Sequence, residues 1–204
     1  ALIMAVSKTR LKLVEVARIL FAKNGLENTT MNDIAVASKK GRRTLYTYFK
    51  NKEELYYAVI ETELERLTQK MSEVALRNIP PEEKLLELVF AHLNLIKEAV
   101  FRNGNLRAEF FRDIWMVEKV RKNFDLAEIN LIQKVLTEGI QQQIFEIQNL
   151  PLISDIIHYC IKGLEVPYIY GRLGEGLNQE TCKPMVQTLP VSYTHLTLPT
   201  ILRV

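Results

Sequence analysis

Hydrophobic residues recur at intervals of three and four positions near the start of the chain, as one face of an amphipathic helix requires. These residues are Leu13, Val14, Ala17, Leu20 and Phe21. They predict a helix that begins near Ser7 and ends at Asn24, with Gly25 free to adopt a left-handed cap. Thr30 and Asp33 then have the spacing of a capping box and predict a short helix over residues 31–38.

A second short helix follows closely. Lys39-Lys40-Gly41 predicts a brief turn, and residues 42–49 predict a helix in which Leu45 and Phe49 lie one turn apart on the inner face. Asn51 is positioned to cap a longer helix that runs to about residue 77. Two short helices joined by a tight turn after a longer one indicate a helix-turn-helix.

The remaining chain also has helical periodicity. A helix is expected to begin at residues 80–83, where prolines precede acidic residues. Further helices are expected over 105–116, 119–142 and 152–172, with fraying from Gly139 and an interruption at Pro167. Asn178 is expected to cap a last helix. The fold class predicted is therefore all-α, with an N-terminal three-helix unit joined to a helical C-terminal domain.

Charge is distributed unevenly along this pattern. The net charge is +3, yet residues 1–52 contain eleven basic and only three acidic residues, whereas residues 53–189 contain 15 basic and 21 acidic ones. A basic unit attached to an acidic body is typical of a nucleic-acid-binding protein, although a solvated basic surface has the same composition.

The second short helix carries the candidate DNA contacts. Burial of Leu45 and Phe49 would leave a polar outer face that suits the major groove, since Arg binds guanine edges and Thr and Tyr hydroxyls reach bases or phosphates. That face holds Arg42, Arg43, Thr44, Tyr46 and Thr47. Lys52, in the first turn of the next helix, is a candidate phosphate ligand.

Two sequence blocks resemble the DNA-binding domain of TetR-family regulators. The first block is residues 29–35, Thr-Thr-Met-Asn-Asp-Ile-Ala, and the second is residues 44–55, Thr-Leu-Tyr-Thr-Tyr-Phe-Lys-Asn-Lys-Glu-Glu-Leu. The resemblance covers residues 8–60 and implies an all-helical homodimeric repressor whose third helix reads the major groove. It places base contacts at Arg42, Arg43 and Thr44, and phosphate contacts at Thr30, Lys39, Tyr46, Tyr48 and Lys52.

The turn departs from the family pattern. Family members commonly have Ala-Gly-Val-Ser where this chain has Ser38-Lys39-Lys40-Gly41, so that Lys40 occupies the place of a buried valine and must extend its ammonium outward. Arg43 replaces a frequent small residue and brings a long cation close to the groove. An operator sequence therefore cannot be transferred from relatives.

The resemblance also implies a domain organisation. Residues 1–52 would form the DNA-binding domain, residues 52–77 a linking helix, and residues 78–189 a regulatory domain that binds a small-molecule inducer and dimerises through its last two helices. Large side chains are candidates to line the inducer pocket, although each of them fits ordinary core better: Phe90, Phe110, Phe111, Trp115 and Tyr159. His92 and His158 are isolated in the sequence and fit satisfied helix histidines better than metal ligands.

The sequence bears on three classes of function. The leading one is a dimeric repressor that a small molecule releases from a palindromic operator, and the alternative is a non-specific or architectural DNA-binding protein. An enzyme is excluded because the sequence has no G-x-S-x-G, glycine-rich phosphate loop, H-E-x-x-H or paired His/Cys motif, and no cofactor is expected. Two cysteines without a CxxC and no long apolar run predict a cytoplasmic protein without membrane contact.

The C-terminal residues have an unusual sequence. Val191-Ser192-Tyr193-Thr194-His195-Leu196 can be encoded by a sequencing-adapter sequence, so residues 190–204 are interpreted as a non-native read-through tail that truncates the last helix. The other interpretation is a natural tail with Pro190 and Pro199 as helix breakers.

Overall fold

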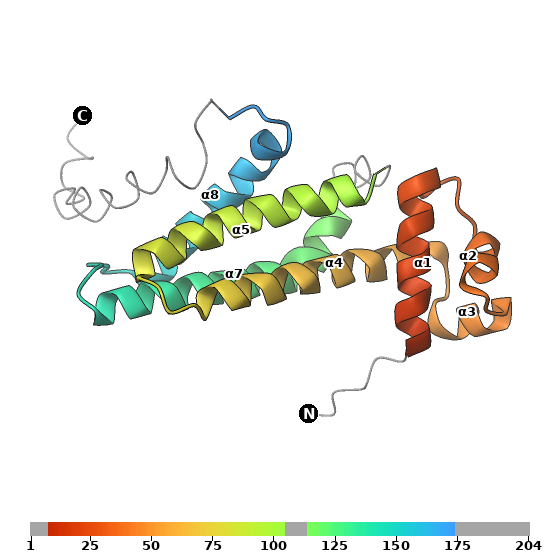
Figure 1. The fold of residues 1–204 in the computed structure, drawn as a ribbon, viewed down its shortest axis with the longest axis horizontal. Helices are drawn as coiled ribbons and strands as arrows, with labels where there is room; N and C mark the ends of the chain where they lie inside the picture. Colours follow the sequence, from red (N-terminus) through yellow and green to blue (C-terminus); the bar gives the residue numbers. More distant parts are fainter. Residues whose placement is uncertain (1–7, 105–113, 174–204) are drawn as a thin grey trace. The chain divides into compact units, whose positions relative to one another are not determined.

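The computed structural model describes residues 8–104 and 114–173. Within these ranges the chain forms seven α-helices and no strand, which confirms the all-α expectation (Figure 1). The helices are α1 (Lys8–Asn24), α2 (Met31–Ser38), α3 (Arg42–Tyr48), α4 (Lys52–Ala75), α5 (Pro81–Arg102), α7 (Ile114–Gln141) and α8 (Leu150–Ile169).

Local signals in the sequence place the ends of the N-terminal helices. Thr30 caps α2 in a complete capping box with Asp33, and Gly25 takes the left-handed conformation after α1 with φ +84°. Asn51 Oδ1 accepts the Glu54 N–H at 2.8 Å, as expected for a cap. The Glu54 carboxylate accepts instead from the Lys50 N–H at 2.6 Å, one residue before the predicted reciprocal position.

The C-terminal helices differ from the prediction at two places. A single helix, α7, covers residues 114–141 where two helices were expected to meet near residue 117, because residues 114–138 contain neither glycine nor proline. Pro167 lies inside α8, which continues two residues further to Ile169. The expected helices over 105–113 and after Asn178 lie outside the described residues.

The helix ends at Gln141, shortly after Gly139, as the sequence indicated, and Gly139 also has a packing role. A Cβ at this position would lie 2.1 Å from Cδ2 of the Phe145 ring, so only glycine admits the ring. The Gly139 carbonyl also accepts the N–H groups of Ile144 and Phe145 at 2.8 and 3.2 Å. The segment after α7 therefore folds back onto the end of the helix.

The chain divides into two compact units. The first unit comprises residues 1–66 and 98–122, and the second comprises residues 67–97 and 123–204. In the first unit the core joins α1, α2, α3 and α4 through residues that are fully buried, namely Leu13, Phe21, Ile34, Leu45 and Leu55. The predicted domain boundaries at residues 52 and 78 stay a prediction.

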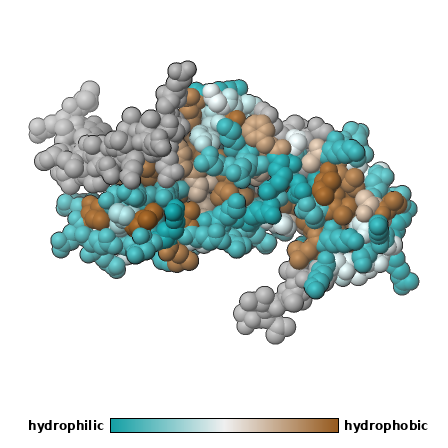
Figure 2. Space-filling model, viewed as in Figure 1, coloured by the Kyte–Doolittle hydropathy of each residue, from teal (hydrophilic) through white to brown (hydrophobic). Residues whose placement is uncertain are grey.

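The second unit has its own core. Leu93 of α5, Ile132 and Leu136 of α7, and Ile161 of α8 form one buried cluster. Figure 2 shows a described surface that is mainly hydrophilic, with hydrophobic residues in small groups. In the described part of the chain no helix combines the length and apolar character needed to cross a bilayer.

Candidate nucleic-acid interface

Helix α3 depends on two buried anchors. It has seven residues, too few to be stable alone in water, so tertiary packing must hold it. Leu45 is fully buried and Phe49 is 2% exposed, and each contributes roughly 2–3 kcal/mol through burial of its apolar surface. The Arg10 guanidinium of α1 lies 5.2 Å from the centroid of the Phe49 ring. The inner face of α3 is therefore buried, as the sequence pattern predicted, and the structure adds a contact with α1.

The turn before α3 places one lysine in an unfavourable backbone conformation. Lys39 has φ 55° and ψ 41° at the C-cap of α2, which costs a residue with a Cβ roughly 1–2 kcal/mol. Its N–H donates to the Val36 carbonyl at 3.0 Å, and the Lys40 N–H donates to the Ala35 carbonyl at 3.0 Å. These two hydrogen bonds fix the backbone of the turn that joins the two short helices.

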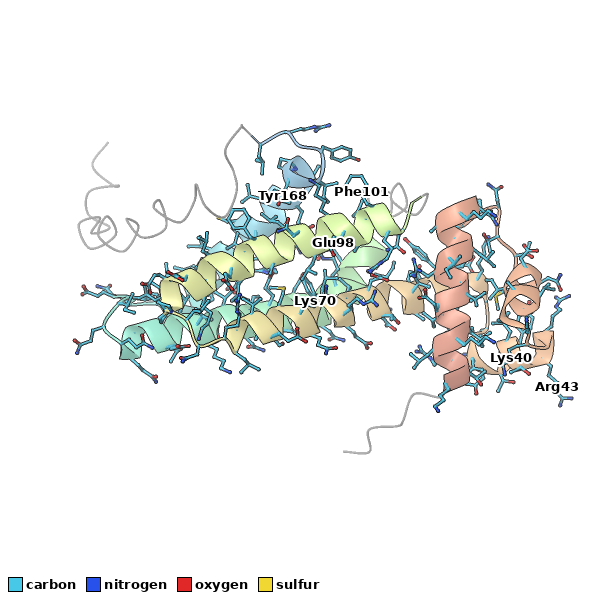
Figure 3. All side chains as sticks on the ribbon, viewed as in Figure 1. Lys40, Arg43, Lys70, Glu98, Phe101 and Tyr168 are labelled. Carbon is cyan, nitrogen blue, oxygen red and sulfur yellow. The ribbon has the colours of Figure 1, made fainter. Side chains whose placement is uncertain are left out.

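The outer face of α3 is polar and accessible. Arg42, Arg43 and Tyr46 are exposed, whereas Thr44 is half-buried. The Arg43 side chain extends away from the helix (Figure 3), and the Arg42 guanidinium lies 6.0 Å from the Tyr46 ring centroid. Two guanidinium groups on one short helix match the donors that read guanine edges in the major groove.

Thr30 uses its polar groups within the capping box. Its hydroxyl donates to Asp33 Oδ2 at 2.7 Å and accepts the Asp33 N–H at 3.2 Å, while its own N–H donates to the same carboxylate at 2.8 Å. The hydrogen bonds from the hydroxyl and then from the backbone N–H hold the pKa of Asp33 below its ordinary value. Contact between the Thr30 hydroxyl and a phosphate would compete with this arrangement.

Lys52 makes an internal contact that the sequence did not predict. Its Nζ donates to the Leu26 carbonyl at 2.8 Å and lies 3.4 Å from the Glu27 carbonyl. The ammonium thus ties the first turn of α4 to the loop after α1. Nothing in the local sequence signals this contact, because the partners lie 25 and 26 residues apart.

The other predicted phosphate ligands differ in exposure. Lys39 is exposed on the turn, and Tyr46 is 45% exposed on α3. Tyr48 is half-buried and already makes contacts within the protein. The predicted residues lie at the two ends of α2, on α3 and at the start of α4, and Thr30 and Lys52 also make hydrogen bonds that serve the fold.

The predicted pocket residues differ in burial where the structure describes their side chains. Phe90 of α5 is buried at 5% exposure, whereas Tyr159 of α8 is 65% exposed and lies on the outer surface of that helix. Phe110 and Phe111 fall outside the described residues, and the side chain of Trp115 is not described either.

Four ionisable side chains form a buried network in the second unit. Glu128 of α7 lies between two histidines, 2.5 Å from His92 Nδ1 and 2.6 Å from His158 Nδ1. Glu165 of α8 lies 2.9 Å from His92 Nε2. The histidines are therefore joined in space although they are isolated in the sequence. The sequence signal for a buried His92 was its position among the apolar residues of α5.

Hydrogen bonds within the network shift the pKa values of His92 and Glu128 in opposite directions. Burial disfavours the charged form of His92, but hydrogen bonds and charge attraction from Glu128 and Glu165 outweigh it and raise the pKa of His92 from 6.5 to about 9. Burial raises the pKa of Glu128, yet the hydrogen bonds from His158 and His92 outweigh it and lower that pKa below 4.5. Among the described side chains, no group of His, Cys, Asp and Glu has the arrangement of a metal site.

Comparison with known proteins agrees with the helix-turn-helix geometry. Residues 13–59 match the family described as bacterial regulatory proteins, tetR family. The HTH-type transcriptional regulator YhgD of Bacillus subtilis is 27% identical over 143 residues, which cover 68% of this chain and 72% of that protein. The probable acrEF/envCD operon repressor of Escherichia coli is 29% identical over 162 residues, with coverage of 76% and 72%.

A solved structure extends the similarity to the whole fold. The transcriptional regulator FadR from Bacillus subtilis, in complex with stearoyl-CoA, matches with a TM-score of 0.64 and 19% identity, covering 89% of this chain and 97% of that chain. The basic helix-turn-helix, the matched N-terminal residues and the shared helical fold lead to one conclusion. Residues 13–59 carry the DNA-binding domain of the tetR family of bacterial regulatory proteins, and the chain as a whole resembles transcriptional regulators of that family.

Proposed function

We propose that the protein is a dimeric repressor that binds a palindromic operator and is released by a small molecule. The observation that carries the proposal is the exposed face of α3, where Arg42 and Arg43 project from a helix anchored by Leu45 and Phe49. Residues 1–52 would then be the DNA-binding domain, residues 52–77 a linking helix and residues 78–189 the regulatory domain.

Base and phosphate contacts would be divided within this surface. Arg42, Arg43 and Thr44 would read base edges, because they occupy the start of α3. Phosphate contacts would come from Lys39, Tyr46 and Tyr48 around the same helix, and from Thr30 and Lys52 in addition to their internal hydrogen bonds. Lys39 and the two arginines are exposed, which supports this division.

A second copy of the chain is the partner proposed for α8. The outer face of this helix carries large apolar side chains at helical spacing, with exposures of 52% for Leu152, 49% for Ile156, 65% for Tyr159 and 38% for Val166. Such a stripe suits helix–helix packing between two protomers. The second helix proposed for this interface belongs to residues outside the described ranges.

Native cysteine chemistry tests the dimer. Cys160 is exposed and immediately follows Tyr159 on α8. In a C182S background, a short bis-maleimide should join two chains through Cys160, and C160S should abolish the product. Absence of a cross-linked dimer, together with a monomer mass in sedimentation, would contradict the proposed interface.

The effector is proposed to act by population shift. A ligand that prefers a conformer whose two α3 helices no longer match successive major grooves, about 34–36 Å apart, would lower operator affinity. Buried Phe90 stays a candidate pocket residue. Stearoyl-CoA, the ligand of the similar FadR structure, is the first compound to test, and an effector should weaken operator binding without unfolding the protein.

Selection from a random duplex library at near-physiological salt tests the central proposal. The native chain should enrich a palindromic motif, and R43A should relax the base preference at one position of each half-site. The alternative, a non-specific architectural binder, predicts binding that is salt-dependent but without an enriched sequence. A lack of enrichment by a dimeric preparation would favour that alternative.

A further inference from the structure

The buried network in the second unit spans three helices. His92 comes from α5, Asp125 and Glu128 come from α7, and His158, Lys162 and Glu165 come from α8. His92 and Glu128 are fully buried or nearly so, and Glu165 is 8% exposed. These six charged or titratable side chains are joined by contacts between α5, α7 and α8.

The network also reaches the outer face of α8. Lys162 Nζ donates to Asp125 Oδ2 at 3.0 Å, and the same ammonium lies 6.0 Å from the Tyr159 ring centroid. The His158 and Tyr159 rings pack edge to face at 5.2 Å. Tyr159, the most exposed apolar residue of α8 in the described chain, is therefore held by two members of the network.

We propose that this network is a proton-dependent brace that sets the position of the outer face of α8, so that self-association requires the proton on His92. Resting on the dimer proposed above, the inference deepens it by naming the residue that controls it. His92 is a positioning residue because its carboxylate partners hold one helix each, Glu128 on α7 and Glu165 on α8.

Electrostatics explains why the proton matters. A charged imidazolium can donate from both ring nitrogens at once, to Glu128 and to Glu165, whereas a neutral ring has only one N–H. After loss of the proton, one carboxylate would face a bare ring nitrogen in a buried site, which is strongly unfavourable. If the neutral ring keeps its proton on Nδ1, where Glu128 accepts it, then Glu165 loses its donor and this contact between α5 and α8 weakens.

Direct hydrogen bonding favours a brace over a metal centre. The ring nitrogens lie 2.5, 2.6 and 2.9 Å from carboxylate oxygens, distances at which the donor and the acceptor contact each other. A metal ion between them would instead require several donors around one point at about 2.0–2.2 Å from the ion. Stoichiometric zinc or nickel in the purified protein would overturn the proposal.

Sedimentation at two pH values tests the coupling to self-association. The native chain should dimerise at about pH 7 and lose at least about tenfold in affinity at about pH 9.5, because His92 then releases its proton. H92Q should already associate weakly at about pH 7 and change little with pH. K70Q removes one exposed charge of the same unit and should behave as the native chain.

The same variants separate competing explanations. Tyrosine ionisation at alkaline pH would persist in H92Q, so a pH effect of equal size in H92Q and the native chain would overturn the brace. Self-association of the native chain that is independent of pH would also overturn it. A native chain that is monomeric at about pH 7 would instead contradict the proposed dimer, and the brace would then be judged by the titration that follows.

Nuclear magnetic resonance of the native chain tests the proposal without relying on the folding of H92Q. In the native chain with isotope-labelled histidine, one buried imidazole should titrate near pH 9, assigned through H158Q and H195Q. Titration of His92 below pH 7 would overturn the proposal. Retention of its proton to about pH 9, with α8 amide signals shifting in the same range, would support it.

Discussion

Replacement of Lys52 by methionine tests whether this side chain serves the fold, the DNA, or both. The Lys52 ammonium donates to the Leu26 carbonyl at 2.8 Å and lies close to the Glu27 carbonyl. Methionine keeps most of the unbranched stem but removes the donor and the charge. The substitution therefore leaves the packing of the stem nearly intact while it removes both proposed polar roles.

The two roles have different magnitudes and different readouts. A hydrogen bond from a charged donor to a carbonyl in a partly exposed site stabilises by about 1 kcal/mol, so the free energy of unfolding should fall by that amount. Loss of one phosphate contact should reduce the slope of log affinity against log salt by about 0.9 per protomer.

Urea unfolding measures the first role, and operator binding at several salt concentrations measures the second. K50M is the matched control, because Lys50 lies two residues earlier with an exposed side chain and uses its backbone N–H, not its ammonium, to bind Glu54. It should leave the free energy of unfolding unchanged.

Each outcome has a definite consequence. A stability loss with an unchanged salt slope would remove Lys52 from the DNA interface and leave it a purely structural role. An unchanged free energy of unfolding and an unchanged salt slope would together refute the reasoning, since neither the hydrogen bond to Leu26 nor the phosphate contact would then contribute.

Three further predictions follow from the geometry of the two units. Thr30→Ala should destabilise the protein by about 1 kcal/mol in urea unfolding, because the α2 cap is lost, whereas an unchanged midpoint would contradict the role of the capping box. Gly104→Ala should lower the thermal midpoint, since Gly104 has φ +47° and a Cβ there would lie 2.7 Å from the Ala22 carbonyl oxygen; a midpoint equal to that of the native chain would show that the backbone shifts freely. Burial disfavours the charged form of His92, but hydrogen bonds to Glu128 and Glu165 outweigh it and raise the pKa of His92 from 6.5 to about 9. Up to about 3 kcal/mol of stability should therefore be present in full below pH 6.5 and lost as the pH rises through 9. Urea unfolding across that range measures this loss, and a flat profile would contradict it.

The sequence by itself determined the local architecture of the DNA-binding unit. The Thr30–Asp33 capping box, the turn at residues 39–41 and the Leu45–Phe49 spacing placed α2 at the residues where the structure has it, and α3 within one residue at its end. These signals are readable because capping, turn formation and helical periodicity act between residues no more than four positions apart. The polar outer face of α3 followed from the same periodicity.

Only the tertiary structure decided the contacts between distant residues. It brought Lys52 to the Leu26 carbonyl, joined His92 and His158 through Glu128, and packed Phe145 against Gly139. Gly139 in particular was interpreted only as a sign of a helix end, because the sequence alone does not distinguish a glycine that a neighbouring ring requires from a glycine at which a helix frays. Hydrogen bonds and charges between separate helices depend on how those helices cross, and the helical period of each segment carries no information on that crossing.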